Sequence, residues 1–234
     1  MLSTPALSVV IPVLNEARCI GATLETIIQH AETCEIIVVD GGSTDDTCTI
    51  VSEYPEVRLL QAGMRGRAAQ MNAGADAAHG KYLLFLHADT HPPVEFDTLI
   101  DACLNQPGVV AGGFGLTFDT RHWLLDVIAR VTQMNFPWLT FGDHGMFVRK
   151  RTFEEVGGYA HLPILEDLDL QRRLRKRGRL ARPPATVRTS ARRFVNNGVV
   201  RQTARNVAIL MGYFIGISPE RLARWYPQTA SAAR

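Results

Sequence analysis

The chain has 234 residues, of which 46% are hydrophobic and 21% are charged, and its formal net charge at pH 7 is +2. This composition is ordinary for a folded globular protein and excludes a chain that is disordered throughout. A net charge so close to zero gives no strong overall attraction to nucleic acid, so we expect no nucleic-acid partner.

The cysteines and the N-terminal sequence indicate the cellular compartment of the protein. Cys19, Cys34, Cys48 and Cys103 are scattered without a CxxC pair, which predicts reduced thiols, not a disulfide framework or a zinc site. The N-terminus has no basic segment followed by an apolar run and a cleavage site, and no stretch reaches the roughly 18 apolar residues that span a bilayer. We therefore expect a cytoplasmic protein.

Short apolar runs alternate with amphipathic segments through the first hundred residues. Strands are expected at 8–13, 35–40, 57–60 and 82–86, with helices after the first three. The first strand is expected to end at Pro12, which has no backbone N–H group, and Asn15 and Glu16 are expected to begin the first helix. The third helix, which extends to Ala78, is rich in alanine and follows a basic loop at 63–67. This alternation is typical of βαβ units with a parallel sheet, so we predict a Rossmann-like α/β half.

The alternation is less regular beyond Leu99. Strands are expected at 109–118 and 145–149, with a segment rich in Trp, Phe, Leu and Met at 123–141. Helices are expected at 166–177 and 205–217, and a short one that begins at 218–220 with proline in its first turn. Because no repeat or low-complexity linker separates the halves, we predict one domain over 1–234.

Polar side chains follow three of the predicted strands. Asn15 and Glu16 follow the first, Asp40 ends the second, and His87 and Asp89 follow the fourth. The carboxyl ends of parallel strands line the ligand crevice of such sheets, so these side chains should lie together. An ionised carboxylate such as that of Asp40 only accepts hydrogen bonds, which suits a nucleobase imide or a ribose hydroxyl. Helix caps and turns are the alternative explanation for each residue taken singly.

Other nucleotide sites fit the sequence less well. A dinucleotide fold requires GxGxxG after the first strand, whereas residues 12–16 read Pro-Val-Leu-Asn-Glu. No GK[ST] sequence of a P-loop occurs, and a nucleotidyltransferase would also be expected to have a glycine-rich loop after the first strand. These three classes are therefore disfavoured.

Five short motifs occur in order along the chain. They are Pro-Val-Leu-Asn-Glu at 12–16, Val-Asp-Gly-Gly-Ser-Thr-Asp at 39–45, Gly-Arg-Ala-Ala-Gln-Met-Asn-Ala-Gly at 66–74, Leu-His-Ala-Asp at 86–89 and Glu-Asp at 166–167. Together they resemble the family 2 glycosyltransferases of GT-A fold, over nearly the whole chain, and among these the small bacterial members without a transmembrane region. The resemblance implies a mostly parallel, Rossmann-like sheet flanked by helices. It also implies a nucleotide-binding half at 1–100 and an acceptor-binding half with C-terminal helices at 101–234.

The resemblance further implies an inverting transfer of a sugar, usually from a UDP-sugar, to an acceptor hydroxyl with a divalent cation, Mn²⁺ or Mg²⁺. The residues that it assigns to the donor are Pro12, Asn15, Glu16, Asp40, Gly66 and Arg67. Asp89 matches the last aspartate of the family's DxD motif and would hold the metal, which would neutralise charge on the departing UDP. Asp167 would be the general base, with Glu166 as the alternative. A negative charge at the start of a helix also explains both residues without catalysis.

His87 departs from the family pattern, in which an aspartate begins the DxD motif. Imidazole is a softer ligand than carboxylate and favours Mn²⁺ over Mg²⁺, so the ribose or metal contact at this position stays open. His91 is a candidate second metal ligand, although a histidine after a strand is more often an ordinary surface residue. Asp143 and His144 are weaker acceptor-side candidates, which a polar turn explains equally well.

The chain also contains a basic run and apolar segments. Arginines and one lysine crowd 172–182, and arginines follow at 188, 192 and 193. Most of them would simply face solvent, but one or two arginines near Arg192, Arg193 and Arg201 are expected at the donor diphosphate, with Arg193 as the first candidate, and others could meet anionic lipid headgroups. Apolar residues at 123–141 and 207–217 fit a membrane interface, an acceptor wall, a dimer interface or plain core. A lipid-linked acceptor, peripheral association with the inner face of the membrane and a homo-oligomer are therefore open alternatives.

Two other function classes remain beside the enzyme. His87 makes a nucleotide-sugar binding protein with impaired catalysis conceivable, and the basic and apolar segments fit a membrane-surface interaction module. The QxxRW motif of processive synthases is absent, which argues against polymer synthesis.

Overall fold

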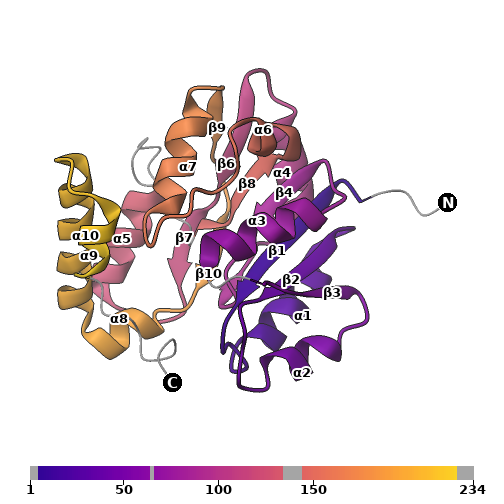
Figure 1. Cartoon of the computed structure of the whole chain (residues 1–234), viewed down its shortest axis with the longest axis horizontal. Coiled ribbons are helices and arrows are strands. Elements are labelled where there is room, and N and C mark those ends of the chain that lie inside the picture. Colours follow the sequence, from indigo (N-terminus) through magenta and orange to yellow (C-terminus); the bar gives the residue numbers. More distant parts are fainter. Residues whose placement is uncertain (1–4, 64–65, 134–143, 226–234) are drawn as a thin grey trace.

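The computed structural model of the chain describes residues 5–63, 66–133 and 144–225. Strands and helices alternate in its first half, as predicted (Figure 1). The strands are β1 (Leu7–Val13), β2 (Glu35–Asp40), β3 (Val57–Gln61), β4 (Tyr82–Phe85), β5 (Thr90–His91), β6 (Val109–Gly113), β7 (Gly115–Phe118), β8 (Met146–Arg149), β9 (Arg179–Ala181) and β10 (Thr186–Thr189). The helices are α1 (Ile20–His30), α2 (Thr47–Ser52), α3 (Arg67–Ala77), α4 (Phe96–Leu104), α5 (Trp123–Gln133), α6 (Lys150–Glu155), α7 (Glu166–Arg175), α8 (Arg192–Asn197), α9 (Val199–Phe214) and α10 (Pro219–Ala223).

Seven strands form the main sheet in the order β3-β2-β1-β4-β8-β6-β9. β3, β2, β1 and β4 are parallel, β8 is antiparallel to both of its neighbours, and β9 is parallel to β6. The predicted α/β class with a mostly parallel sheet is therefore confirmed. The chain builds outward from β1 to β3 and then returns to β4 on the other side of β1. The crevice at such a reversal, at the carboxyl ends of the strands, is where open α/β sheets bind ligands.

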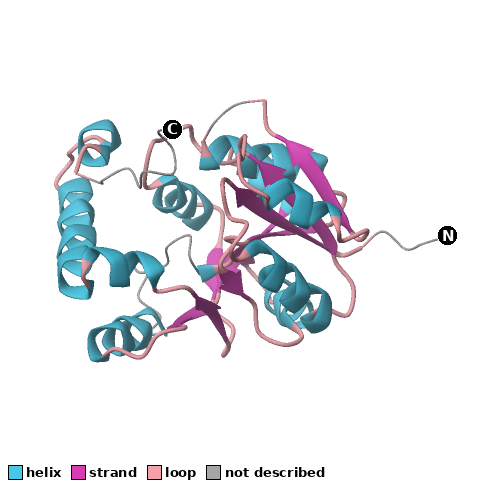
Figure 2. Cartoon of the chain, turned by 90° about the horizontal axis from the view of Figure 1, so that it is seen from below, coloured by secondary structure: helices cyan, strands magenta, loops and turns pink. Residues whose placement is uncertain are grey.

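Helices cover both faces of the main sheet (Figure 2). Successive strand residues point to opposite faces. On one face Val9 and Ile11 belong to a core shared with α1, α2 and α4. On the other face Val10 and Val39 belong to a core shared with α3, α6 and α7. All four residues of β4 are buried, as expected for a strand that is covered by helices on both faces of the sheet.

The prediction that the first strand ends at Pro12 is wrong, because β1 continues to Val13. The carbonyl of Val10 accepts the N–H of Leu86, so Val10 faces β4, and Pro12 faces the same way. β4 ends at Phe85, opposite Val10. No strand therefore needs the N–H group that Pro12 lacks.

The first helix also begins later than predicted, at Ile20 and not at Asn15 and Glu16. Asn15 has a positive φ of 55°, which asparagine tolerates better than most residues. The carbonyl of Glu16 accepts the N–H groups of Cys19 and Ile20. Asn15 and Glu16 thus lie in a loop at the end of β1, where their side chains can reach a ligand or a neighbouring loop.

Other boundaries in the second half differ from the prediction. The expected strand at 109–118 is two strands, β6 and β7, in different sheets, and the expected helix at 205–217 is α9, which begins at Val199. The expected helices at 166–177 and from 218–220 are confirmed as α7 and α10, with Pro219 in the first turn of α10. Of the segment at 123–141, α5 accounts for Trp123–Gln133, and the rest lies outside the described residues.

A second sheet, in the order β5-β10-β7, joins distant parts of the chain. Thr189 of β10 is paired with Thr90 of β5, and their hydroxyl oxygens are 2.8 Å apart. Because β5 follows Asp89 directly and β10 ends shortly before Arg192, this pairing brings the start of α8 beside Asp89. The C-terminal helices and α5 lie together on the side of the molecule away from β3 (Figure 1).

Candidate active site at the carboxyl edge of the sheet

Hydrogen bonds join the loops that follow β1 and β2. The backbone N–H of Asn15 donates to Ser43 Oγ at 2.9 Å, and Asn15 Oδ1 accepts the N–H of Thr44 at 2.7 Å. One residue further, the N–H of Glu16 donates to Thr47 Oγ1 at 2.8 Å. The structure therefore brings together two of the strand ends that the sequence assigns to the donor.

Asp40 is the buried member of this group, with 3% of its surface exposed. Its carboxylate accepts the N–H of Gly42 at 2.9 Å and that of Ser43 at 3.1 Å, which closes the turn after β2. An ionised carboxylate has about four acceptor positions, so these bonds leave capacity for a ligand. They also fix the orientation of the carboxylate.

Gln70 on α3 holds the same two strand ends from the side of the helix. It is 5% exposed, and its Nε2 donates to the carbonyl oxygens of Val13 and Val39, each at 2.8 Å. Val13 and Val39 immediately precede the Asn15 loop and Asp40. In the sequence Gln70 is one residue of the motif at 66–74, and no local pattern could have assigned it these partners.

An ion pair joins the start of α3 to the start of α7. Arg67 Nη1 lies 3.7 Å from Glu166 Oε1, with side-chain exposures of 39% and 8%. Gly66, just before α3, has a φ of 123°, a conformation that glycine adopts readily and other residues rarely. Two predicted site residues that are 99 positions apart thus meet, and the buried Glu166 carboxylate is engaged by a cation.

Asp167 is positioned through Tyr159, which the sequence analysis missed. Asn72 on α3 holds the backbone of Tyr159 twice: its Oδ1 accepts the N–H and its Nδ2 donates to the carbonyl, both at 2.9 Å. Burial, the charges of Asp167 and Glu166, and a hydrogen bond to Asp167 raise the pKa of Tyr159 well above its usual value. A neutral phenol at the Asp167 carboxylate fixes its position without a competing charge. Leu165, just before α7, has a φ of 65°, a left-handed conformation that costs energy for leucine.

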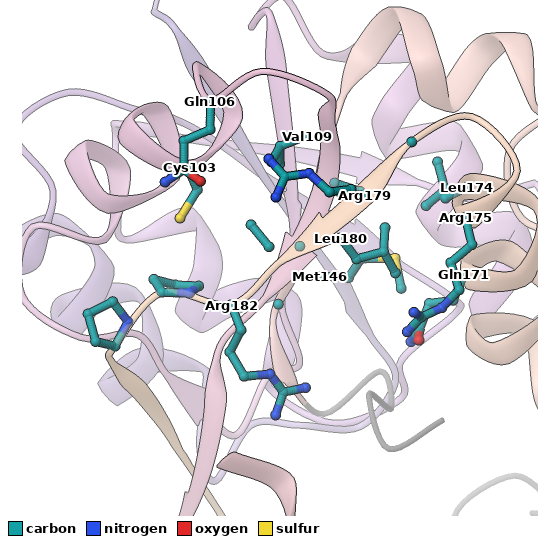
Figure 3. Close-up of a pocket in the computed structure, with 17 residues that line it drawn as sticks. Cys103, Gln106, Val109, Met146, Gln171, Leu174, Arg175, Arg179, Leu180 and Arg182 are labelled. Carbon is teal, nitrogen blue, oxygen red and sulfur yellow. The ribbon is translucent and has the colours of Figure 1, made fainter. Parts of the chain in front are cut away.

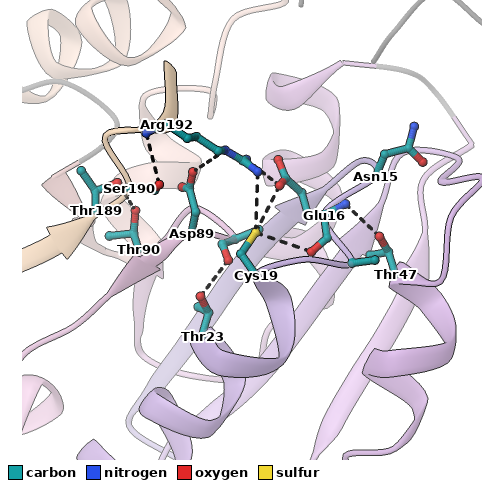
Figure 4. A network of polar contacts seen from close by, with 12 residues as sticks. Asn15, Glu16, Cys19, Thr23, Thr47, Asp89, Thr90, Thr189, Ser190 and Arg192 are labelled. Atoms are coloured by element: carbon teal, nitrogen blue, oxygen red, sulfur yellow. Dashed lines mark hydrogen bonds and ion pairs between the residues drawn. The ribbon is translucent and has the colours of Figure 1, made fainter. Parts of the chain in front are cut away.

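The region around Asp89 contains a network of charges (Figure 4). Arg192 from α8 lies between two carboxylates, with Nη2 at 2.6 Å from Glu16 Oε2 and Nε at 3.3 Å from Asp89 Oδ2. The Cys19 thiol lies 3.2 Å from the same oxygen of Glu16. Burial, and then the charge of Glu16, raise the pKa of Cys19 to about 12, so Cys19 is a thiol at neutral pH.

These residues fit a divalent cation that also binds phosphate. The described residues contain no cluster of three or more His, Cys, Asp or Glu side chains that could hold a metal alone. Asp89 and Glu16 nevertheless face one guanidinium, so two hard carboxylate donors already share a cation. Mg²⁺ and similar ions are commonly held by one or two carboxylates plus substrate phosphates.

The histidines lie in different surroundings. His87 is half-buried beyond β4, between the buried Leu86 and Ala88. His91 Nδ1 is 2.8 Å from Thr26 Oγ1 of α1, and burial, followed by the charge of Arg188, lowers the pKa of His91. Its Nε2 is therefore the atom that a metal would have to use. His144 is 1% exposed and its Nδ1 lies 3.0 Å from the Phe114 carbonyl oxygen, an interior position, whereas Asp143 lies outside the described residues.

The remaining donor candidate, Arg193, is exposed at the start of α8. A separate hollow of about 600 Å³ surrounds β9 (Figure 3). Its described lining includes Arg175, Arg179 and Arg182 but none of the predicted site residues. Gln171 on its wall follows Asp167 by about one turn of α7, so the hollow lies beside α7, and its described lining includes none of Glu16, Asp40 and Asp89.

Comparison with known families gives a match over most of the chain. A family model described as Glycosyl transferase family 2 matches residues 8–156. The PGL/p-HBAD biosynthesis glycosyltransferase of Mycobacterium tuberculosis is 40% identical over 189 residues, which cover 72% of this chain and 69% of that protein. The uncharacterized glycosyltransferase YibD of Escherichia coli is 36% identical over 112 residues, or 45% of this chain and 33% of that one. The chain thus spans a third of one relative and about two thirds of the other.

Solved structures show the same fold at low identity. Staphylococcus aureus TarS 1-349 in complex with UDP superposes with a TM-score of 0.66 at 19% identity, covering 79% of this chain and 60% of that one. The mannosyltransferase PcManGT of Pyrobaculum calidifontis, in complex with GDP-Man and Mn²⁺, gives a TM-score of 0.61 at 21% identity, over 88% and 65% of the two chains. The predicted GT-A fold is confirmed.

Proposed function

The chain belongs to glycosyltransferase family 2, and we propose that it moves a single sugar from a UDP-sugar to an acceptor hydroxyl with inversion. The observation that carries most weight is the ion pair between Arg67 and Glu166. It joins the loop that would close over the nucleotide to the helix that carries Asp167. The solved relatives bound to UDP and to GDP-Man with Mn²⁺ support a nucleotide-sugar donor and a divalent cation.

The donor would lie along the carboxyl edge of the sheet. Asp40 and Asn15, with Pro12 and Glu16 beside them, would hold the nucleoside, and Gly66 and Arg67 would cover it. Asp89 would hold the cation together with the diphosphate, with His87, His91 and Arg193 as further candidates around it. When bound, the divalent cation would neutralise charge that develops on the leaving UDP.

Asp167 would act as the general base. Its carboxylate would take the proton of the acceptor hydroxyl while the hydroxyl oxygen attacks the anomeric carbon from the face opposite to UDP. One carbon–oxygen bond forms as the bond to the diphosphate breaks, which inverts the anomeric centre. Tyr159 would hold Asp167 in place, and Glu166, engaged by Arg67, is less suited to accept the proton.

Two measurements test this proposal. UDP should bind with Mn²⁺ in calorimetry, and Asp167→Asn should bind UDP as the wild type does while losing at least about a hundredfold in transfer, the usual range for general-base catalysis. Asp169→Asn is the matched control, because it removes a half-buried carboxylate two positions beyond Asp167 on α7. Full turnover by Asp167→Asn would contradict the assigned base.

An impaired nucleotide-sugar binding protein is the second candidate, because His87 replaces a family aspartate. Such a protein would bind the donor without cleaving it. Release of UDP from UDP-sugars by the wild-type protein, with or without acceptor, would exclude it. Absence of UDP release across donors, with UDP still bound, would favour it.

We further propose that the protein docks on the inner face of the membrane and takes a lipid-linked acceptor there. Eleven large hydrophobic side chains are exposed in the described residues, and nine of them lie on α5 or between α8 and Trp225. On α9 the exposed residues Val200, Val207 and Met211 recur at helical spacing. None of the described helices is long and apolar enough to cross a membrane.

The charge of the C-terminal segment favours an anionic lipid surface as the partner of the exposed hydrophobic side chains on α5 and from α8 to Trp225. Residues 192–225 contain six arginines and one acidic residue, a net charge of +5, whereas the whole chain has +2. Exposed apolar side chains on a segment rich in arginine suit the interface of an anionic bilayer, where each basic residue contributes about 1 kcal/mol.

Vesicle co-sedimentation tests the docking. We expect binding to vesicles with anionic phosphatidylglycerol, loss of binding at high salt, and clearly weaker binding by Met211→Asp. Val94→Asp is the matched control, because Val94 is 62% exposed but lies neither on α5 nor in the segment from α8 to Trp225. If no variant binds vesicles and Met211→Asp instead dissociates a dimer in sedimentation velocity, the face joins two copies of the chain and the membrane proposal fails.

A further inference from the structure

Arg192 connects the C-terminal half of the chain to the donor edge. Its guanidinium lies 2.6 Å from Glu16 and 3.3 Å from Asp89, two residues that follow different strands of the main sheet (Figure 4). Its Nη1 also lies 4.0 Å from the Cys19 sulfur. The side chain is 45% exposed, whereas those of Glu16 and Asp89 are 22% and 18% exposed. A half-exposed arginine thus bridges two largely covered carboxylates.

The two carboxylates stabilise the charged form of the Arg192 guanidinium. Burial by itself would lower the pKa of Arg192, but the hydrogen bond from Arg192 to Glu16 and the charges of Glu16 and Asp89 raise it overall. In the described structure the guanidinium contacts the Oδ2 atom of Asp89, the expected metal ligand, and the carboxylate of Glu16, which is expected at the donor. The guanidinium is therefore a cation at the place where the donor's cation is expected.

The backbone next to Arg192 is anchored, so its side chain can move without the helix. The N–H of Ser190 donates to the carbonyl of Asp89 at 3.2 Å, and the N–H of Ala191 donates to Asp119 Oδ1 at 2.8 Å. Ala191 itself is fully buried. The Arg192 side chain extends from this anchored point over the edge of the sheet and can turn about its own bonds.

We propose that Arg192 is a resident counter-cation of the donor site, which holds Asp89 and Glu16 in the donor-free protein and passes to the diphosphate when a divalent cation binds Asp89. This inference rests on the proposed function. The guanidinium and a divalent cation cannot both occupy the same side of Asp89 Oδ2, so each displaces the other. A guanidinium released from Asp89 remains next to the site, and its planar array of N–H groups suits two phosphate oxygens at once.

The proposal gives Arg192 opposite effects on metal and on nucleotide. Removing a competing cation should let Mn²⁺ bind more tightly to the donor-free protein. Removing a group that binds the diphosphate should weaken the binding of UDP when Mn²⁺ is saturating. A residue that only supports the local structure would weaken both, so the two signs together distinguish exchange from structural damage.

Arg192→Gln tests both effects in the full-length protein. Mn²⁺ binding without nucleotide is measured by the loss of the free-ion signal in electron paramagnetic resonance, and UDP binding at saturating Mn²⁺ by calorimetry. We expect Arg192→Gln to increase the affinity for Mn²⁺ about tenfold, equivalent to about 1.4 kcal/mol, and to decrease the affinity for UDP by a similar factor. Arg192→Lys keeps the charge but not the two-carboxylate geometry and should fall between Arg192→Gln and the wild type.

Arg177→Gln is the matched control, since it removes one exposed arginine beyond the end of α7 and should change neither affinity. Unchanged or weaker Mn²⁺ binding by a folded Arg192→Gln overturns the exchange. UDP binding by the wild type with Mn²⁺ distinguishes this result from failure of the proposed function, in which no nucleotide would bind the wild type.

Discussion

Gln70→Leu is the substitution for which the structure gives the clearest expectation. The two side chains are similar in size, but leucine cannot donate hydrogen bonds. In the wild type Gln70 Nε2 donates at 2.8 Å to the carbonyl oxygens of Val13 and Val39, the residues at which β1 and β2 reach the site. The substitution therefore removes two buried hydrogen bonds with little change in volume.

The magnitude follows from what each carbonyl retains. Val13 O still accepts the N–H of Gly41 at 2.9 Å, and Val39 lies within the β1–β2 ladder. Neither oxygen is therefore left without a donor, so the net value of about 1 kcal/mol per hydrogen bond applies, not the larger penalty for an orphaned group. Two bonds give about 2 kcal/mol, which for a chain of this length lowers Tm by about 4–8 °C.

Thermal unfolding followed by circular dichroism measures the shift, with Gln29→Leu as the control because Gln29 is exposed on α1. Gln70→Glu should lose more stability than Gln70→Leu at neutral pH, because a buried carboxylate would face two carbonyl oxygens that it cannot bond. If Gln70→Leu and the Gln29→Leu control have the same Tm, the two hydrogen bonds of Gln70 contribute nothing to stability and the reasoning is wrong.

Two further predictions concern stability. Gly74→Ala should lower stability by about 1–3 kcal/mol, since a Cβ there would lie 2.3 Å from Val10 Cγ1 and force α3 away from the sheet; an unchanged denaturant midpoint would show that the helix has room. Glu35→Gln should destabilise the fold at neutral pH: burial alone raises the pKa of Glu35, but hydrogen bonds from His79 and Ser8 outweigh it and hold the pKa below the ordinary 4.5. The stability that this carboxylate adds is therefore complete above pH 4.5 and is lost as the pH falls through its folded pKa, so the difference between wild type and variant should shrink in acid and would contradict the assignment if it grew.

The sequence by itself determined the sheet and the positions of its strand ends. Apolar runs such as 82–86 are local signals, because burial on both faces requires apolar side chains at every position. The polar residues that follow each run indicate where the strand stops, and parallel strands bring those ends to one edge. For this reason the sequence alone, together with the family 2 resemblance, assigns Asn15, Asp40 and Asp89 to one edge.

Element boundaries depended on neighbours and were less predictable. Pro12 lies inside β1 because the adjacent strand has already ended, and nothing near Pro12 in the sequence records where β4 stops. The run at 109–118 divides between two sheets because its two parts find different partners, β8 and β9 for the first and β10 for the second. Pairing between strands far apart in the chain decides such boundaries.

Only the tertiary structure decided how the site is held together. Gln70 meets Val13 from 57 positions away, Asn72 meets Tyr159 from 87, and Arg192 meets Glu16 from 176. Periodicity indicates burial, and a motif indicates a loop, but a side chain's hydrogen-bond partner is set by how complete elements pack. That is why the sequence could name Glu16, Asp89 and Asp167, while the residues that position them became visible only in the folded chain.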